Sequence, residues 1–231
     1  MLRATPSGRF DLDATFSATY FSLRWGMVAV AASLPFVLWF GGRLVYGIPL
    51  CPSMSAYYHT CMRNWFVGFL FAAAACLYLY KGISDRENDL LNVAAVLAVG
   101  TAVNPSDWHP HWWFLGDKIT PHGICAVSFF LLIALACWLC QDDSLKLKLI
   151  PPEDVARYRR KYAAIGVALV VLPVLAVILN ILVSGDSSHP VFWAEALALG
   201  VFAFYWYTKS GELRSAIDVS MRRRAAGSDE L

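Results

Sequence analysis

Six long runs of apolar residues dominate the chain, and short polar segments separate them. A helix needs about 20 apolar residues to cross the hydrocarbon core of a bilayer, and these runs approach or exceed that length. They cover residues 25–47, 64–81, 89–104, 122–140, 162–184 and 190–208. The pattern predicts an all-α fold, a polytopic membrane bundle of six transmembrane helices.

Two of the runs contain residues that interrupt an apolar helix. Run 89–104 is the shortest and includes Asn92 and Gly100, whereas run 162–184 includes Pro173. A proline is tolerated in a membrane helix where neighbouring helices satisfy the freed backbone groups, so we expect a kink there and not a break. The polar first 24 residues lack the apolar core and cleavage site of a signal peptide, which predicts that the first run is retained.

The composition indicates a membrane protein and not a soluble one. Hydrophobic residues make up 58% of the chain and charged residues 16%, whereas soluble domains carry about 25% charged residues. These values exclude a nucleic-acid binder, a secreted disulfide-rich miniprotein and a coiled coil. We divide the chain into a cytoplasmic N-terminal segment, 1–24, a six-span domain, 25–208, and a basic cytoplasmic tail, 209–231.

The basic residues predict the orientation of the spans. With six spans, the two termini and the second and fourth loops share one side of the membrane. That side holds all of the 19 Lys and Arg residues except Arg43, Arg63 and Lys118. Since cytoplasmic loops carry the excess of Lys and Arg, both termini are predicted to be cytoplasmic in a bacterial inner membrane.

The same topology gathers titratable side chains on the outer side. They are His59, His109, His111, His122, His189, Asp107, Asp117, Asp186 and Glu195. Ionisable groups in or beside spans usually face the bundle interior or a wet cavity. Arg43 and Glu195 have similar predicted depths, so either they form an ion pair or Arg43 extends to the headgroups.

The segment between the first two runs contains two cysteines and a Ser-x-x-x-His pattern. Cys51 and Cys61 are ten residues apart on the oxidising side, which favours a disulfide, with two free thiols as the alternative. Ser55 and His59 would lie on one face of a helix. A hydroxyl and an imidazole placed in this way could share a metal-bound water.

Three other histidines each leave two interpretations open. His109 and His111 suit a metal site, but the tryptophans around them are equally typical of an aromatic belt at the headgroups. His122 opens the fourth run, where it either caps the helix or points into the bundle as a functional group. P-loop, dinucleotide-binding and Gly-x-Ser-x-Gly motifs are absent from the sequence.

The order of several residues resembles a known six-span superfamily. Pro52, Ser53 and Ser55 precede the second run, His122-Gly-Ile-Cys-Ala opens the fourth, an Arg-rich loop precedes the fifth, and Trp193-Ala-Glu195 opens the last. This order resembles the DRAM/Sfk-type family, which includes eukaryotic proteins that remodel GPI-anchor lipids and bacterial relatives of unknown function. The resemblance covers most of the chain and implies a lipid-related function, with His122 and Glu195 corresponding in character to that family's histidine and glutamate.

A fainter resemblance, at Ser55-x-x-x-His59, is to the CREST membrane hydrolases. Those enzymes hold zinc with this histidine and a later His-x-x-x-His pair, and they use a nearby aspartate. In this chain His189 has no second histidine at that spacing, and Asn64 stands near the place of the acidic residue. A zinc site would therefore need a different set of ligands, namely His59, His122 and Glu195.

These features predict a membrane protein that engages a lipid or lipid-linked substrate at the outer leaflet. Its polar pocket would be framed by Ser55, His59, Arg63, His122 and Glu195, and Arg43 or Arg63 would hold an anionic headgroup. If the protein is catalytic, His59, His122 and Glu195 would bind zinc or act as acid and base.

The alternative function is that of a non-catalytic subunit or regulator of a larger membrane complex. Small residues such as AVAAS at 29–33 and AAAAC at 72–76 permit close contacts between helices of different chains. The expected partners are therefore membrane lipids and either another membrane protein or a second copy of this chain, with no nucleic acid.

Overall fold

The computed structural model describes residues 12–105, 107, 119–145, 152–182 and 189–228, and the regular elements in these ranges are all helical. They are α1 (Leu12–Phe36), the π-helix η1 (Val37–Gly41), α2 (Gly42–Tyr46), the 3₁₀ helix η2 (Ser55–His59), α3 (Arg63–Leu79), α4 (Asp85–Val103), α5 (Pro121–Leu139), α6 (Gln141–Leu145), α7 (Pro152–Leu182) and α8 (Pro190–Ser228). The predicted all-α class is confirmed, and each of the six apolar runs forms a helix.

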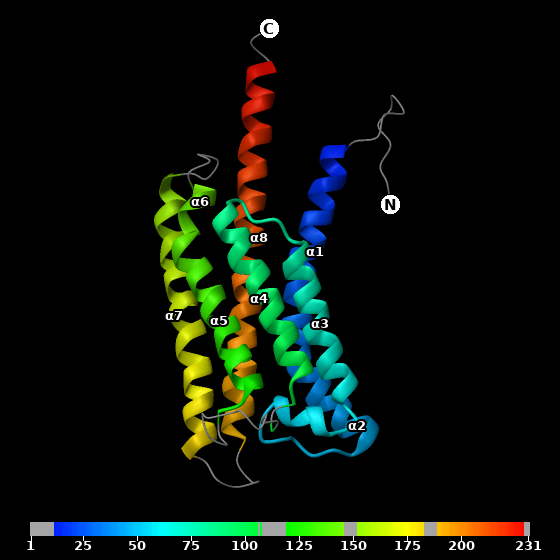
Figure 1. Ribbon diagram of the computed structural model, residues 1–231. Helices are drawn as coiled ribbons and strands as arrows, with labels where there is room; N and C mark the ends of the chain where they lie inside the picture. Colours follow the sequence, from blue (N-terminus) through cyan, green and yellow to red (C-terminus); the bar gives the residue numbers. More distant parts are fainter. Residues whose placement is uncertain (1–11, 106, 108–118, 146–151, 183–188, 229–231) are drawn as a thin grey trace.

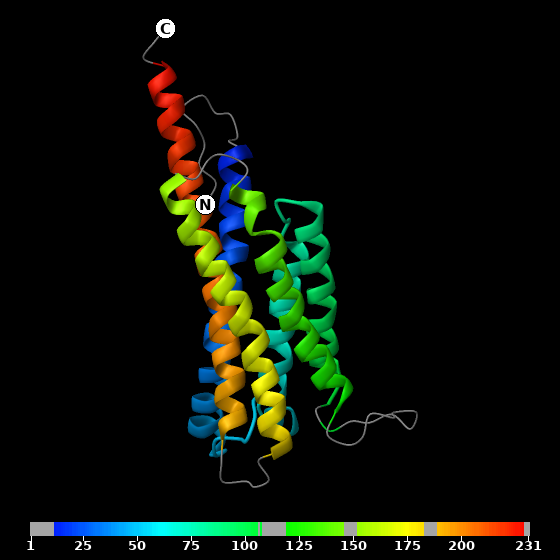
Figure 2. The ribbon, with the colours of Figure 1, turned by 90° about the vertical axis from the view of Figure 1, so that its left-hand side faces the viewer.

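The six long helices, α1, α3, α4, α5, α7 and α8, run side by side between the two ends of one bundle (Figure 1). Helices that follow one another in this set pack together, from α1 through α3, α4, α5 and α7 to α8, and α8 packs back on α1. We call the end with α2 and η2 the Glu195 end and the opposite end the Lys209 end. Figure 2 shows α8 projecting past the other helices at the Lys209 end.

Four stretches are long and apolar enough to cross a membrane. They are Ala18–Tyr46, Pro121–Asp143, Asp154–Leu182 and Pro190–Glu212. Helix α3 is apolar but shorter, and α4 carries Asp85, Arg86, Glu87 and Asp89 in its first turns. Many large apolar side chains on the outside of the bundle are exposed, which suits contact with lipid. These features indicate a membrane protein.

Helix α1 changes its winding after Pro35. Proline supplies no backbone N–H, so the regular bonding of the helix is interrupted there, and the π-helix η1 follows at once. The chain continues into α2, and this helix ends at Gly47, whose φ of 67° is favourable for glycine. By contrast, α7 continues through Pro173 without a break, as predicted.

Both predicted boundaries of the spanning domain lie inside helices. The boundary after residue 24 falls within α1, and the boundary after residue 208 falls within α8. Lys209, Ser210 and Glu212 are buried in the bundle. The first residues of the predicted tail therefore belong to the packed domain, because α8 remains in contact with its neighbours for another turn.

Candidate functional site

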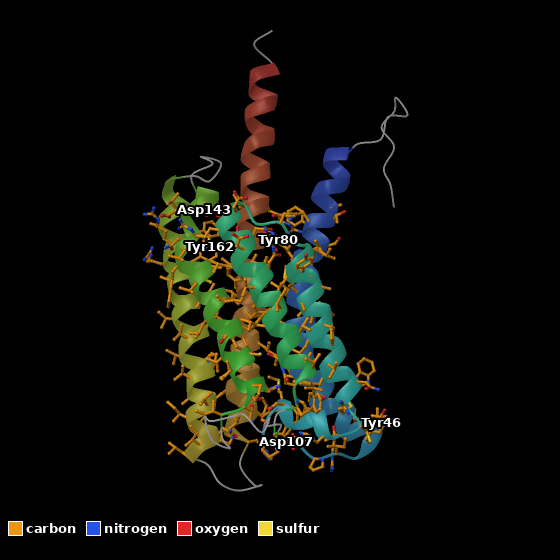
Figure 3. All side chains as sticks on the ribbon, in the orientation of Figure 1. Tyr46, Tyr80, Asp107, Asp143 and Tyr162 are labelled. Carbon is orange, nitrogen blue, oxygen red and sulfur yellow. The ribbon has the colours of Figure 1, made fainter. Side chains whose placement is uncertain are left out.

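A cavity of about 360 Å³ opens at the Glu195 end. Its polar lining consists of Ser53, Ser55, Asp107, Thr120, His122, Asn180 and Glu195. These residues come from the segment around η2, from the two ends of the α4–α5 connection, and from α5, α7 and α8. Figure 3 labels Asp107 at this end of the bundle. The structure thus brings together Ser55, His122 and Glu195, three of the predicted site residues.

The segment before η2 is fastened to the start of α8. The Phe192 N–H donates to the Pro52 carbonyl at 3.0 Å, and the Met54 N–H donates to Oε2 of Glu195 at 2.6 Å. Oγ of Ser53 accepts the Ala56 N–H at 3.1 Å, which ties the segment before η2 to its first turn. These bonds fix one wall of the cavity against α8.

Ser53 and Ser55 form a hydroxyl pair in this wall. Their Oγ atoms are 3.0 Å apart, and either can be the donor. Since Oγ of Ser53 also accepts the Ala56 N–H, its lone pairs are partly used. The pair therefore presents adaptable hydrogen-bonding groups to the cavity.

Glu195 has one carboxylate oxygen bonded and one without a hydrogen-bond partner among the described residues. Oε2 accepts the Met54 N–H, whereas no described group donates to Oε1. The predicted Arg43–Glu195 ion pair is wrong, because Arg43 lies in α2 with an exposed side chain and outside the lining of this cavity. Among the residues that the structure describes, Glu195 therefore lines the cavity with neither Lys nor Arg beside it.

The ring of His122 is held by two backbone carbonyls. Its Nδ1 lies 2.8 Å from the Thr101 oxygen and 3.1 Å from the Asn104 oxygen, at the end of α4. Both neighbours are acceptors, so Nδ1 carries the proton and Nε2 is left as the basic nitrogen. Thr120, and not His122, caps α5 by accepting the Gly123 N–H at 3.0 Å. His122 is thus a buried cavity residue.

His59 is paired with a residue of the cavity lining but is not itself part of that lining. Its Nε2 is 3.2 Å from Oδ1 of Asp107, and the two side chains are 45% and 74% exposed. Asp107 lines the cavity, but His59 does not. Because the pair is so exposed, its contribution to stability is small.

The three predicted metal ligands do not form one site. His59 is paired with Asp107, Nδ1 of His122 is bound to carbonyls, and Glu195 accepts from the Met54 backbone. Within the part of the chain that the structure describes, three His, Cys, Asp or Glu side chains are nowhere grouped closely enough to hold a metal ion. The residues present therefore do not fit the predicted zinc site.

The arginines predicted to hold a headgroup also lie away from the cavity. Arg63 donates from Nη2 to the Tyr58 hydroxyl at 2.6 Å, and its guanidinium carbon is 4.3 Å from the centre of that ring. Neither Arg63 nor Arg43 lines the cavity. Arg63 therefore does not frame the polar pocket as predicted, because the fold of the segment around η2 directs it to Tyr58.

A second, apolar cavity of about 100 Å³ adjoins the polar one. Ser55, His122, Ala126, Phe130 and Glu195 line both. Beyond these shared residues the second cavity is walled by aliphatic and aromatic side chains, among them Leu34, Phe66, Phe69, Leu70, Phe129 and Phe202. The two cavities are thus a polar chamber and an apolar slot that lie side by side and share five lining residues.

Cys51 and Cys61 are free thiols, so the predicted disulfide is not formed in this structure. Cys51 is half-buried and Cys61 is exposed. Burial raises the pKa of the Cys51 thiol, although a contact with Tyr57 lowers it.

His189 is partly buried beside the start of α8. The predicted sites at His109, His111, Asp117 and Asp186 lie outside the described residues.

A buried charged network that was not predicted from the sequence lies at the Lys209 end. Lys209 of α8 forms an ion pair with Glu87 of α4. Arg24 of α1 donates to the Lys209 carbonyl and, at 2.7 Å, to the Tyr80 hydroxyl. The signal that could have located Glu87 is the pattern Ser84-Asp85-Arg86-Glu87, since Ser-x-x-Glu marks a helix start; Oγ of Ser84 indeed accepts the Glu87 N–H.

The network continues to α7. The Tyr162 hydroxyl donates to Oε2 of Glu212 at 2.5 Å, and both side chains are buried. Two basic residues, Arg24 and Lys209, and two acidic residues, Glu87 and Glu212, are thus buried at one end of the bundle. Figure 3 labels Tyr80 and Tyr162 at this end. The buried Lys209–Glu87 ion pair and the hydrogen bonds to Tyr80 and Tyr162 are typical of a structural role.

Comparisons with protein-family models, with curated proteins and with solved structures found no match.

Proposed function

We propose that this chain is a six-span protein of a bacterial inner membrane that binds one lipid or lipid-linked molecule at its Glu195 end. The polar chamber would hold the headgroup, and the adjoining slot would hold hydrocarbon. The observation that carries the proposal is that Ser55, His122 and Glu195 line both cavities, so that a polar site and an apolar site lie side by side. A concave site with apolar walls and a few convergent polar groups is the usual form of a small-molecule site.

The distribution of basic residues supports the orientation in this proposal. Arg157, Arg159 and Arg160 lie in the first turns of α7, and Arg214 lies late in α8, so all four belong to the Lys209 end. An excess of Arg and Lys marks the cytoplasmic side. The Glu195 end and its cavity would then open toward the outer leaflet, with both termini in the cytoplasm.

The bound molecule can be sought directly. The protein would be purified in a mild detergent and its retained lipids identified by native mass spectrometry, for the natural chain and for Ala126→Phe. Ala126 lines both cavities, so a phenylalanine there would take up space where they adjoin. Retention of a lipid by the natural chain and its loss in the variant supports the proposal. Equal retention by two folded proteins contradicts it.

One observation favours the alternative of a non-catalytic subunit in a larger complex. Of the small residues in α1 and α3, Ala31 and Ala74 are buried within the bundle, whereas Ala32 and Ala75 are exposed. The exposed ones permit close approach of another membrane helix. Co-purification of a stoichiometric protein, lost in Ala32→Leu/Ala75→Leu, would favour this alternative over lipid binding.

A further inference from the structure

The chemistry of the polar chamber defines which headgroup it can take. Its lining contains two carboxylates, Asp107 and Glu195, and among its described lining residues neither Lys nor Arg occurs. A phosphate or carboxylate headgroup would meet these like charges in a site of low dielectric constant, where repulsion is stronger than in water. The chamber therefore disfavours an anion that lacks a positive group.

Several polar groups of the chamber offer unused hydrogen-bond acceptors, while the Asn180 amide offers both an acceptor and donors. Oε1 of Glu195 has no donor among the described residues, and Nε2 of His122 is an acceptor because Nδ1 carries the proton. The Ser53 and Ser55 hydroxyls can accept as well. A primary ammonium has three donors and no acceptor, so it complements this set.

The position of Glu195 strengthens the argument. Its carboxylate is held by a single backbone N–H, and the first turns of α8 bring it between the polar chamber and the apolar slot. A carboxyl group removed from water either takes up a proton or pairs with a cation, so a cation that enters the chamber stabilises the charged form of Glu195. At the other end of the bundle Glu87 is paired with Lys209. Among the described residues no such lysine or arginine lines the cavity beside Glu195.

We infer that the Glu195 chamber binds the primary ammonium group of an amine-bearing lipid, with Glu195 as its counter-charge and the hydrocarbon in the apolar slot. This inference rests on the proposed function. Charge-assisted hydrogen bonds are about twice as strong as neutral ones. The ammonium group therefore adds selectivity to that which the hydrocarbon chain of the lipid supplies. Either a single-chain amine or an ethanolamine phospholipid presents the required group.

The test compares ligands that share one hydrocarbon chain and differ in the head. A long-chain primary amine, the chain-matched alcohol and the chain-matched carboxylate would be titrated into the purified full-length protein and followed by native mass spectrometry. We expect the amine to bind about tenfold more tightly than the alcohol, and the carboxylate most weakly. Glu195→Gln keeps an oxygen for the Met54 N–H but should abolish the preference. Asp89→Asn, which neutralises an exposed carboxylate of α4, should preserve it.

Each outcome separates this inference from the proposed function. If the natural chain retains none of the three probes, both fall. If it retains amine and alcohol equally, the lipid site stands and the ammonium assignment falls. Should Glu195→Gln fail to fold, the quaternary trimethylated amine replaces the variant. It offers no N–H donors, so binding as tight as that of the primary amine would overturn the inference.

The source of the ammonium can be distinguished with phospholipids of matched chains. A preference for the ethanolamine over the choline headgroup would support the inference and identify a phospholipid as the ligand. Retention of the long-chain amine without such a preference would also support the inference, and it would identify a single-chain amine as the ligand.

Discussion

Lys209 of α8 and Glu87 of α4 form an ion pair whose side chains are 4% and 0% exposed. The pair joins two helices that are not neighbours in the ring of helix contacts, so it connects opposite sides of the bundle. Oε2 of Glu87 also accepts the Ile83 N–H at 2.9 Å, at the start of α4. A buried pair with additional hydrogen bonds is costly to break, because removal of one partner leaves the other charge unpaired.

We therefore expect Lys209→Met to reduce the free energy of unfolding by about 3–5 kcal/mol. The measurement is the thermal melting temperature in detergent. Lys209→Met/Glu87→Gln should recover most of the loss, since no unpaired charge remains and glutamine still offers an oxygen to Ile83. Lys81→Met, at an exposed position, is the control and should change little. A melting temperature of Lys209→Met equal to that of the natural chain would contradict the structural role of the pair.

The helices could be predicted from the sequence, because an apolar run of span length has few other stable structures. The gathering of His122, Asp107 and Glu195 at one end followed from the alternation of the spans. The partners of individual side chains could not be predicted. Arg63 was expected to hold a headgroup, yet it lies on Tyr58, because the 3₁₀ turn η2 places the two residues together.

The buried charges at the Lys209 end also could not be predicted from the sequence. Arg24 and Lys209 looked like ordinary topology determinants beside the ends of spans, because a sequence does not show which charges are solvated. Burial of Glu87 depends on contacts between α4 and α8, whose residues are more than a hundred positions apart in the chain. Such pairing is a property of the packed bundle and has no local pattern.

Gly100 allows α4 and α5 to approach closely near the candidate site. A Cβ at position 100 would lie 2.8 Å from Sγ of Cys125. We expect Gly100→Ala to lower the free energy of unfolding by about 1–3 kcal/mol through overpacking, and Gly100→Ala/Cys125→Ala to reverse most of that loss. Gly68→Ala in α3 is the matched control, because nothing lies within 4 Å of its added Cβ. If all three variants melted alike, the close approach would be of no consequence.

The two cysteines of the segment around η2 should react at different rates. The pKa of the Cys51 thiol is raised by burial, so at neutral pH less of it is the reactive thiolate, whereas Cys61 is exposed. We expect a membrane-impermeant maleimide to label Cys61 first. Labelling of Cys51 should keep accelerating as the pH rises past about 8.5, the ordinary thiol pKa.

The same experiment tests the orientation. In right-side-out vesicles Cys61 should be labelled from outside, and Cys61→Ser should remove the fast signal. Labelling in inverted vesicles alone would place the Glu195 end in the cytoplasm. Failure of both cysteines to react without prior reduction, followed by reaction after reduction, would instead establish the disulfide that this structure lacks.

His122 has two separable tasks, and two substitutions distinguish them. Its Nδ1–H donates to the carbonyls of Thr101 and Asn104 and thereby joins α5 to the end of α4, while its Nε2 is the basic atom available to the cavity. His122→Asn keeps a donor close to the position of Nδ1 but lacks Nε2. His122→Ala loses both and leaves two buried carbonyl oxygens with fewer partners.

We expect His122→Asn to melt close to the natural chain but to bind the long-chain amine about tenfold more weakly, the equivalent of one lost hydrogen bond of about 1.4 kcal/mol. His122→Ala should show the same loss of binding and, in addition, a stability loss of about 1–3 kcal/mol. Native mass spectrometry and thermal melting measure the two effects on one sample. Unchanged amine binding by a well-folded His122→Asn would show that Nε2 takes no part in the site, and the role of His122 would then be to hold α4 and α5 together.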